Sequence, residues 1–189
     1  VKNPEAGKVK TRLSKTVGRD KALAVYQKLL AYTRNVASPV EADKQVWYSR
    51  YIDVNDQWDP KQYSKVIQQG KDLGERMKYA FAEAFRNGYK KVVIIGSDCA
   101  ELSSGIIEQA FDSLGKQDVV VGPSVDGGYY LLGMKRLHPN LFEDIEWSTP
   151  VVLSKTLERV KQERLGLHLL PELNDVDDEA DWNKVKEQF

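Results

Sequence analysis

The sequence has few of the features that place a protein outside the cytosol. It contains one cysteine, Cys99, in 189 residues, which excludes a disulfide within the chain and fits a reducing compartment. No apolar run approaches the roughly 20 residues that cross a bilayer, and no signal peptide is visible. We therefore expect a cytoplasmic protein that has no membrane partner.

The sequence also lacks a net charge. Lys plus Arg and Asp plus Glu number 28 each, which gives a formal net charge of +0 at pH 7. This balance argues against a general binder of nucleic acids or membrane surfaces. Hydrophobic residues make up 41% and charged residues 30% of the chain, an ordinary globular composition. The length suits a single domain over residues 1–189.

Three common ligand-binding motifs are missing. The P-loop pattern G-x-x-x-x-G-K-[ST] does not occur, and neither does the dinucleotide pattern G-x-G-x-x-G. The acidic run NDVDDEADW (174–182) is not an EF-hand loop, because the glycine of the sharp turn is absent. These absences argue against P-loop phosphate binding, a nicotinamide-type Rossmann site and EF-hand calcium binding.

Helical and strand patterns alternate along the chain. Apolar spacing and capping residues predict helices over 20–37, 72–88, 103–115, 150–164 and 178–189. Short apolar runs predict strands over 44–51, 65–70, 92–95, 118–123, 128–134 and 165–173. The alternation predicts an α/β protein with a layered sheet. The run VVII (92–95), apolar on both faces, predicts a central strand.

Two of the predicted strands end close to a carboxylate. The strand at 92–95 runs through Gly-Ser into Asp98, and the strand at 118–123 leads into Asp126 in GPSVDGG. Ligands of open α/β sheets bind outside the carboxyl ends of strands, so we expect both carboxylates at one edge of the sheet. Position alone fits Asp98 equally well as a turn cap and as a metal ligand. Gly127 and Gly128 indicate a tight turn, and they also let backbone approach a ligand closely.

The amino-terminal segment PEAGKVKTRL is rich in cations. Gly7 is followed by Lys8, Lys10 and Arg12 in a short loop before a predicted helix. Backbone N–H groups and cationic side chains both favour phosphate, so the segment suits an anionic ligand. A solvated surface is the simpler interpretation of a charge run taken alone.

The carboxyl-terminal segment concentrates acidic residues. Asp178 and Glu179 suit the first turn of the last predicted helix, where the helix dipole favours negative charge. Asp175 and Asp177 precede that helix, so they need another reason, and a hard divalent cation is one. Together with the basic loop and Asp98, they fit a nucleotide diphosphate site, where Mg²⁺ or Mn²⁺ needs carboxylates and neutralises a leaving group.

Cysteine and histidine chemistry is not expected. Cys99 follows a buried strand, and nothing in the sequence supplies a base that would activate its thiol. His138 and His168 are isolated, with no partner at a metal-binding spacing. We expect structural roles for all three residues.

Six segments, in order and over nearly the whole chain, carry a family resemblance that is specific only when they are taken together. They are KNPEAGKVKTRL (2–13), QQGKDLGERM (68–77), VVIIGSDCAEL (92–102), GPSVDGGYYLLGM (122–134), FEDIEWSTPVV (142–152) and LPELNDVDDEADW (170–182). The chain resembles the glycosyltransferase-like family associated with arsenosugar biosynthesis, also described as a radical-SAM/selenodomain-associated transferase. That family resembles the GT-A fold of nucleotide-diphospho-sugar transferases. It is also similar to nucleotidyltransferases that make molybdenum-cofactor dinucleotides or activate phospholactate.

The resemblance implies a three-layer α/β/α domain of GT-A type with a mostly parallel central sheet. The implied nucleotide and phosphate contacts are Gly7, Lys8, Lys10, Arg12, Gln69, Gly70 and Arg76. The implied ligands for Mg²⁺ or Mn²⁺ are Asp98, with Asp175 and Asp177 as a further contact. The motif facing the sugar or acceptor is matched by Asp126, Gly127, Gly128 and Tyr129. Trp147 and Ser148 match a motif whose role is unassigned.

The chain departs from the family pattern at three places. GT-A enzymes often carry D-x-D at the metal strand, whereas Gly-Ser-Asp98 offers one carboxylate, so the metal must take other ligands from elsewhere. Ala100 stands where family members usually have proline, which implies a looser turn. The family's leading strand would precede Val1, and we expect residues 1–189 to lack it.

Three functions remain open. The leading hypothesis is a metal-dependent, glycosyltransferase-like enzyme with a nucleotide-diphospho-sugar donor, in which Asp98 anchors the metal and Asp126 is the base for an acceptor hydroxyl. The alternative is a nucleotidyltransferase that attacks a nucleoside triphosphate and releases pyrophosphate, which the basic loop fits slightly better. The third is a non-catalytic nucleotide-binding protein on the same scaffold. The nucleobase and sugar of the donor, the acceptor, and the oligomeric state, a homo-oligomer included, stay open.

Overall fold

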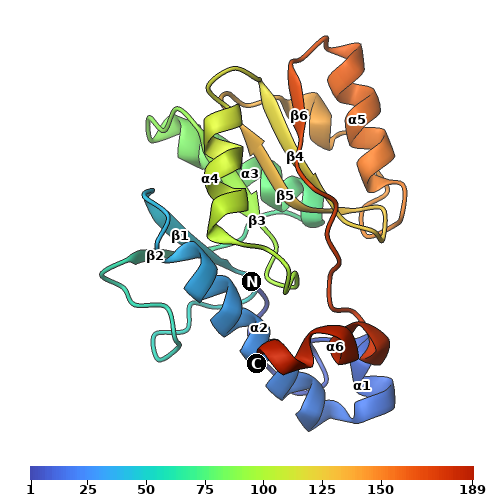
Figure 1. The fold of residues 1–189 in the computed structure, drawn as a ribbon. Helices are drawn as coiled ribbons and strands as arrows, with labels where there is room; N and C mark the ends of the chain where they lie inside the picture. Colours follow the sequence, from blue (N-terminus) through green and yellow to red (C-terminus); the bar gives the residue numbers. More distant parts are fainter. The chain divides into compact units, whose positions relative to one another are not determined.

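The computed structural model describes residues 1–189 as two compact units (Figure 1). The first unit comprises residues 1–67, 97–104 and 174–189, and the second comprises residues 68–96 and 105–173. Neither unit is a continuous stretch of sequence, because the chain passes between them repeatedly. The single domain expected over residues 1–189 stays a prediction.

In the first unit, a two-stranded parallel sheet packs on a long helix. β1 (Lys44–Tyr48) runs parallel to β2 (Tyr63–Ile67), and helix α2 is Arg19–Ala37. Tyr26 and Leu30 of α2 form one buried cluster with residues of both strands. The predictions of a helix at 20–37 and of two strands are confirmed, with the strand ends shifted by a few residues.

The other side of α2 packs against short helices that lie around its first half (Figure 1). These are α1 (Thr11–Val17), α6 (Glu179–Val185) and the 3₁₀ helix η2 (Lys186–Gln188). Leu13, Val25 and Val185 share one buried cluster. The predicted last helix is confirmed as α6 and η2. Sequence periodicity does not reveal α1, because Leu13 is its one buried residue.

The second unit contains a four-stranded mixed sheet. Its strands are β3 (Val92–Ile95), β4 (Val119–Pro123), β5 (Tyr129–Met134) and β6 (Leu167–Leu169). The spatial order is β3-β5-β4-β6, with β5 antiparallel to both neighbours and β6 parallel to β4. The parallel elements expected of an α/β protein are present, and the turn after β4 adds the antiparallel strand β5.

The expected position of β3 needs a correction. Within the four-stranded sheet, β3 pairs with β5 alone, so it is an edge strand and not a central one. The reason is the hairpin, because β5 folds back from β4 and occupies the place between β4 and β3. The residues of β3 are accordingly half-buried, whereas all residues of β4 are buried.

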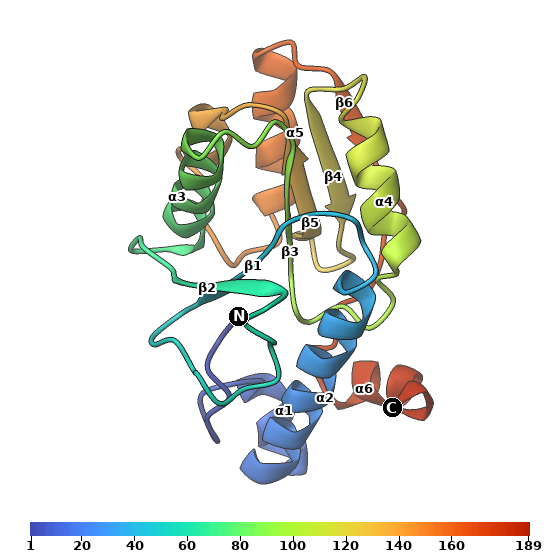
Figure 2. The same ribbon diagram turned by 90° about the vertical axis from the view of Figure 1, so that its left-hand side faces the viewer.

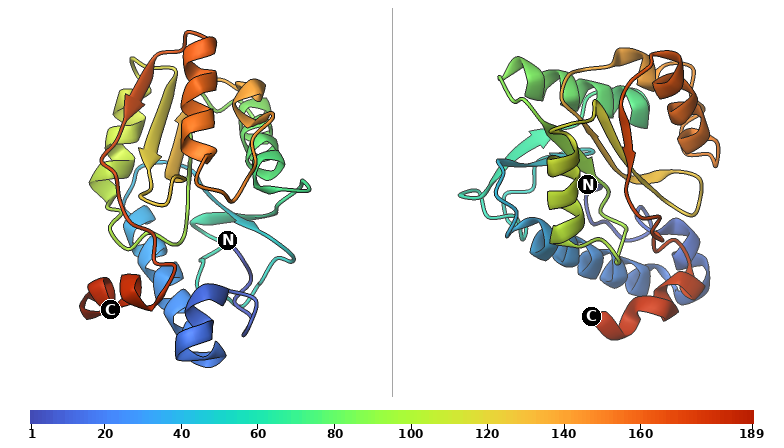
Figure 3. Two further views of the ribbon diagram at one scale, coloured as in Figure 1. Left: turned by 90° about the vertical axis from the view of Figure 1, so that its right-hand side faces the viewer. Right: turned by 45° about the horizontal axis from the view of Figure 1, so that its top comes forward.

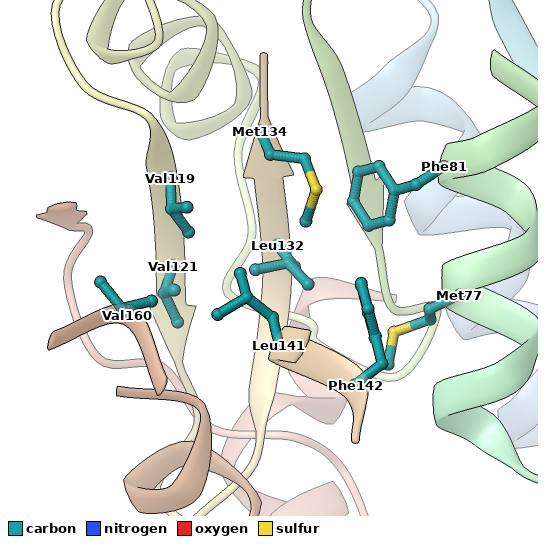
Figure 4. Packing of buried hydrophobic residues seen from close by; sticks show 9 residues of the cluster. All are labelled: Met77, Phe81, Val119, Val121, Leu132, Met134, Leu141, Phe142 and Val160. Carbon is teal, nitrogen blue, oxygen red and sulfur yellow. The ribbon is translucent and has the colours of Figure 1, made fainter. Parts of the chain in front are cut away.

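Helices cover both faces of this sheet (Figures 2 and 3). On one face, α3 (Leu73–Arg86), η1 (Pro139–Phe142) and α5 (Val152–Gln162) contribute to a core around Leu132 and Met134 of β5 (Figure 4). On the other face, Leu114, directly after α4 (Ser104–Ser113), approaches Gly133 of β5. The predicted α/β layering is therefore confirmed. No helix combines the length and apolar character needed to cross a membrane.

Candidate functional site

In the first unit, two segments far apart in sequence lie side by side. The Val176 N–H donates to the Asp98 carbonyl at 2.9 Å. Cys99 and Asp175 form an isolated antiparallel bridge. This backbone pairing brings the predicted metal residue Asp98 next to the late acidic motif, as the sequence predicts.

Lys10 contacts both of these segments. As the residue that precedes α1, it has a φ of 46°, in the left-handed region that non-glycine residues seldom adopt. Its side chain is 3% exposed, and Nζ lies 2.8 Å from Asp98 Oδ2 and 3.8 Å from Asp177 Oδ1. No protein acceptor receives a well-aligned hydrogen bond from this Nζ. Backbone strain and a buried ammonium of this kind are typical of functional sites.

The other cationic residues of the basic loop are solvent-exposed. Arg12 NH1 lies 3.0 Å from Asp177 Oδ2, with its side chain 72% exposed. Lys8 forms an ion pair with Glu5 at 3.0 Å. Gly7 has a φ of 78° and so supplies a left-handed turn before them. The structure therefore brings Lys10 and Arg12 to the acidic motif and directs Lys8 to a neighbour in its own loop.

Asp98 and Asp177 both lie beside the Lys10 ammonium group. Each places one oxygen within 4 Å of the Lys10 Nζ. Mg²⁺ is often held by one or two carboxylates while substrate phosphates complete its shell. No group of three Asp, Glu, His or Cys side chains gathers to hold a metal, so substrate oxygens would be needed. The metal roles of Asp98, Asp175 and Asp177 stay predictions.

The remaining acidic residues of the late motif cap α6. Asp178 accepts a hydrogen bond from the Asp181 N–H at 3.0 Å, and Asp181 Oδ2 accepts from the Asp178 N–H at 3.3 Å. This reciprocal pair is a capping box. The predicted cap at the last helix is therefore confirmed for Asp178, and it leaves Asp175 and Asp177 outside the cap.

The buried tyrosine and cysteine near Asp98 stay in their neutral forms. Burial, and then the negative charge of Asp98, raise the pKa of Tyr26 well above its usual range. Burial raises the pKa of Cys99 to about 12. The Cys99 thiol is therefore protonated at neutral pH, which agrees with the structural role expected for it.

In the second unit, the DGG motif forms a tight turn. Asp126 Oδ1 accepts a hydrogen bond from the Gly128 N–H at 2.9 Å, and Gly127 has a φ of 87°. The Asp126 side chain is otherwise exposed at the end of the β4–β5 hairpin. The Tyr129 hydroxyl is buried in the interior beside Thr156, and burial raises its pKa. The roles of Asp126 and Tyr129 toward a substrate stay predictions, and the buried hydroxyl does not favour that of Tyr129.

The predicted nucleotide segment forms the entry to α3. Asp72 caps this helix by accepting from the Glu75 N–H at 2.8 Å. Gly70 has a φ of 135°, and a Cβ there would lie 2.7 Å from the backbone nitrogen of Arg76. Arg76 Nε donates to the Gly70 carbonyl at 3.1 Å, and Gln69 lies just before this turn. These contacts fix the loop's shape, whereas the binding roles of Gln69, Gly70 and Arg76 stay predictions.

The segment 147–150, which contains the unassigned Trp147 and Ser148, packs against both the α3 entry and the DGG turn. A Cβ on Gly74, in the first turn of α3, would lie 2.1 Å from the Trp147 indole. A Cβ on Gly127 would lie 2.1 Å from the Pro150 carbonyl oxygen. The Leu153 N–H also donates to the Gly127 carbonyl at 2.8 Å. Sequence reasoning misses Gly74 and Pro150 as partners, because a close approach between distant segments leaves no local pattern.

Solved structures identify the class to which the layered fold belongs. A protein described as a candidate nucleotide-diphospho-sugar transferase from Desulfovibrio desulfuricans G20 shares 37% identity and a TM-score of 0.89, over 97% of this chain and 82% of that one. Rv0371c of Mycobacterium tuberculosis H37Rv, in complex with manganese, matches with a TM-score of 0.58 and 14% identity, over 85% and 86%. CMP:2-keto-3-deoxy-manno-octonic acid synthetase, complexed with CTP, matches with a TM-score of 0.56 and 10% identity, also over 85% and 86%. The predicted nucleotide-diphospho-sugar transferase fold, of GT-A type, is thereby confirmed.

The chain can also be assigned to a sequence family. Residues 27–149 match the family described as an uncharacterized protein conserved in bacteria (DUF2064), and the chain belongs to this family. The matched stretch contains Asp98 and Asp126 and begins after Lys10. No curated protein matches the chain in sequence.

Proposed function

We propose that this protein is a metal-dependent transferase that uses a nucleotide-diphospho-sugar as its donor. The observation that carries the proposal is the buried Lys10 ammonium beside Asp98 and Asp177, with Arg12 on the other oxygen of Asp177. Cations in such a place suit diphosphate oxygens, and the carboxylates suit a divalent metal. The 37% identity with the Desulfovibrio protein, described as a candidate nucleotide-diphospho-sugar transferase, supports the donor class.

In this proposal, Lys10 and Arg12 bind the diphosphate of the donor, and Asp98 and Asp177 hold Mg²⁺ or Mn²⁺. When bound, the metal supplies positive charge to the diphosphate as its bond to the sugar breaks. Lys10 and Arg12 donate hydrogen bonds to the diphosphate oxygens and stabilise the same developing charge. Manganese in the complex of Rv0371c, which shares the fold, makes Mn²⁺ a sensible first metal to test.

Asp126 is the proposed base for the acceptor. Its exposed side chain keeps Oδ2 available while Oδ1 accepts from the Gly128 N–H at 2.9 Å. In sugar transfer, an acceptor hydroxyl oxygen attacks the anomeric carbon, the diphosphate leaves, and a base takes the hydroxyl proton. General-base catalysis contributes about 10²–10⁴-fold, so Asp126→Asn should lower turnover by at least about 10²-fold. Full turnover in this variant would remove Asp126 from that role.

The proposal is tested by thermal unfolding against nucleoside diphosphates and nucleotide sugars, with Mn²⁺ and with EDTA. A ligand at about 100 times its dissociation constant adds roughly 2.7 kcal/mol to the free energy of unfolding, which raises the melting temperature. We expect a shift with one nucleotide family that becomes smaller in EDTA and in Asp98→Asn, because the metal's share of the binding is lost. A flat panel, or a shift of the same size after both changes, would contradict a metal anchored by Asp98.

A nucleotidyltransferase is the second candidate. The fold shared with the CTP complex of the CMP:2-keto-3-deoxy-manno-octonic acid synthetase makes this reaction worth testing, and so do the cations Lys8, Lys10 and Arg12 in one loop. The released product separates the two reactions, because sugar transfer yields a nucleoside diphosphate and nucleotidyl transfer yields pyrophosphate. Nucleotide binding without either product would favour the third reading, a non-catalytic nucleotide-binding protein.

Other expectations from the sequence stay predictions. They are the cytoplasmic location, the association with arsenosugar biosynthesis, and the identity of the acceptor. A homo-oligomeric state likewise stays a prediction.

A further inference from the structure

We propose that Lys10 is a built-in cation that keeps the Asp98–Asp177 pair closed to divalent metal until a phosphate-bearing ligand engages its ammonium group. This inference rests on the proposed function, since it concerns the same phosphate and metal groups. It adds an order of events, in which phosphate binds first and metal second. The ligand class is a nucleoside diphosphate or triphosphate, recognised through its phosphate oxygens.

The first support is the burial of Lys10 together with its unaligned donors. The side chain is 3% exposed, and its Nζ is paired with Asp98 Oδ2 at 2.8 Å, while the next carboxylate oxygen is 3.8 Å away and no contact has good hydrogen-bond alignment. An ammonium has three donors, and burying it without directed acceptors is unfavourable. Phosphate oxygens would supply those acceptors, so the ammonium has a reason to leave the carboxylates when phosphate arrives.

The second support is the balance of charge around the pair. The groups that face one another are two carboxylates, Asp98 and Asp177, and two cations, Lys10 and Arg12. Two negative and two positive charges sum to zero, so the closed cluster attracts a free divalent cation only weakly. Once phosphate holds Lys10 and Arg12, the two carboxylates present a net charge of about −2 to a metal.

The third support is that the carboxylates remain accessible while the lysine does not. The Asp98 and Asp177 side chains are 42% and 38% exposed, against 3% for Lys10. Asp98 Oδ1 receives only a long contact from Ser97 Oγ at 3.4 Å. A metal can therefore approach the carboxylates from solvent, and the ammonium is the group that competes with it.

The test uses Mn²⁺ alone and inorganic pyrophosphate alone, each against wild type and Lys10→Met. Free Mn²⁺ is followed by electron paramagnetic resonance, and pyrophosphate binding is followed by calorimetry in EDTA. We expect the variant to bind Mn²⁺ at least about tenfold more tightly than wild type, because a competing charge is removed. It should bind pyrophosphate at least about tenfold more weakly, because a charged donor is lost. Opposite changes with the two probes are the signature of a shared lysine.

Two variants make the result interpretable. Lys65→Met removes a lysine from a different buried ion pair of the same unit, Lys65 Nζ to Asp56 Oδ1 at 2.7 Å, and should leave both affinities unchanged. Lys10→Gln repeats the test with a polar side chain if the methionine variant does not fold, as judged by circular dichroism.

The outcomes separate the lysine's role from the proposed function. Pyrophosphate binding that depends on Lys10, with Mn²⁺ binding equal in wild type and both Lys10 variants, overturns the competition and leaves the transferase proposal intact. No Mn²⁺ binding by any variant overturns the competition and the metal site together. A gain in Mn²⁺ affinity in Lys65→Met would equally overturn it, because the effect would then not belong to Lys10.

Discussion

Two lysine–aspartate clusters occur in the first unit, and they are built differently. In the cluster around Asp56, Lys65 Nζ donates to Asp56 Oδ1 at 2.7 Å and to the Asp53 carbonyl at 2.7 Å. The Tyr48 hydroxyl donates to Asp56 Oδ2, and the Trp58 N–H donates to Oδ1 at 3.0 Å. The Lys65 and Asp56 side chains are 10% and 12% exposed. Both charges are buried, and both are hydrogen-bonded.

The Lys10 cluster also contains a lysine–aspartate ion pair, but its lysine lacks the well-aligned hydrogen bonds that Lys65 makes. Its lysine is buried, its two aspartates reach solvent, and the Lys10 Nζ has no well-aligned acceptor. The comparison separates two uses of the same residues. Asp56 and Lys65 link the segment after β1 to β2, and the hydrogen bonds of this cluster are made to other groups of the protein. Lys10, Asp98 and Asp177 form a pair of carboxylates and an ammonium whose remaining bonds are left for a ligand.

The largest effect that would sharpen this comparison is on stability. Removing one partner of a buried pair costs about 3–5 kcal/mol. Because the Lys65 and Asp56 side chains are 10% and 12% exposed, Lys65→Met should lose up to about that much free energy of unfolding. Lys10→Met should lose no more than about 1 kcal/mol, because the aspartates it leaves behind can be hydrated. Urea unfolding of the two variants measures the difference.

The pair of variants is matched. Methionine keeps the aliphatic stem in both variants. A non-glycine residue still occupies the left-handed position of Lys10, so each change measures the loss of the ammonium group. Equal losses in the two variants would break the comparison, because Lys10 would then be as structural as Lys65.

Much of the fold follows from sequence pattern. Helices with a wide buried face, such as α2 and α3, and apolar runs such as VVVGP of β4, were each at their predicted positions. The predicted central position of β3 in its sheet was wrong, because an apolar strand of four residues has the same sequence pattern at an edge and at the centre. Register and strand order depend on the β4–β5 hairpin, and no local pattern in VVII encodes them.

The candidate site was predictable in its residue types and less so in its contacts. Lys10, Asp98 and Asp177 could be singled out, but their convergence depends on backbone pairing between residues 98–99 and 175–176. The Asp56 cluster gave no signal, because Asp56 lies in a polar stretch that suggests only a loop. Burial decides which charged residues matter, and a single sequence does not reveal burial of isolated charges.

A smaller effect concerns alkaline pH. Burial, and then the hydrogen bond to Asp56, raise the pKa of Tyr48 above its ordinary value near 10. A tyrosine whose folded pKa is raised contributes stability that is complete below the unfolded pKa of about 10 and is lost as pH rises above it. Each such tyrosine steepens the loss by up to about 1.4 kcal/mol per pH unit. Tyr26, near Asp98, is shifted in the same direction.

Tyr48→Phe should therefore unfold with a shallower dependence on pH between about 10 and 11 than wild type. Urea unfolding at intervals from pH 8 to 11 measures the slope, and Tyr26→Phe provides the counterpart next to the Lys10 cluster. An unchanged slope in Tyr48→Phe would show that this tyrosine ionises as easily in the folded protein as in the unfolded chain. That result would mean that Tyr48 does not take part in the cluster around Asp56.

The smallest expected effect is at Lys8. Its ion pair with Glu5 spans 3.0 Å, with side chains 58% and 29% exposed, and exposed pairs of this kind contribute little to stability. Lys8→Met should therefore leave urea unfolding nearly unchanged and weaken pyrophosphate binding less than Lys10→Met does. Calorimetry of both variants in EDTA makes the comparison. Equal losses of pyrophosphate affinity would mean that phosphate responds to the charge of the whole loop, and the buried position of Lys10 would then confer no advantage.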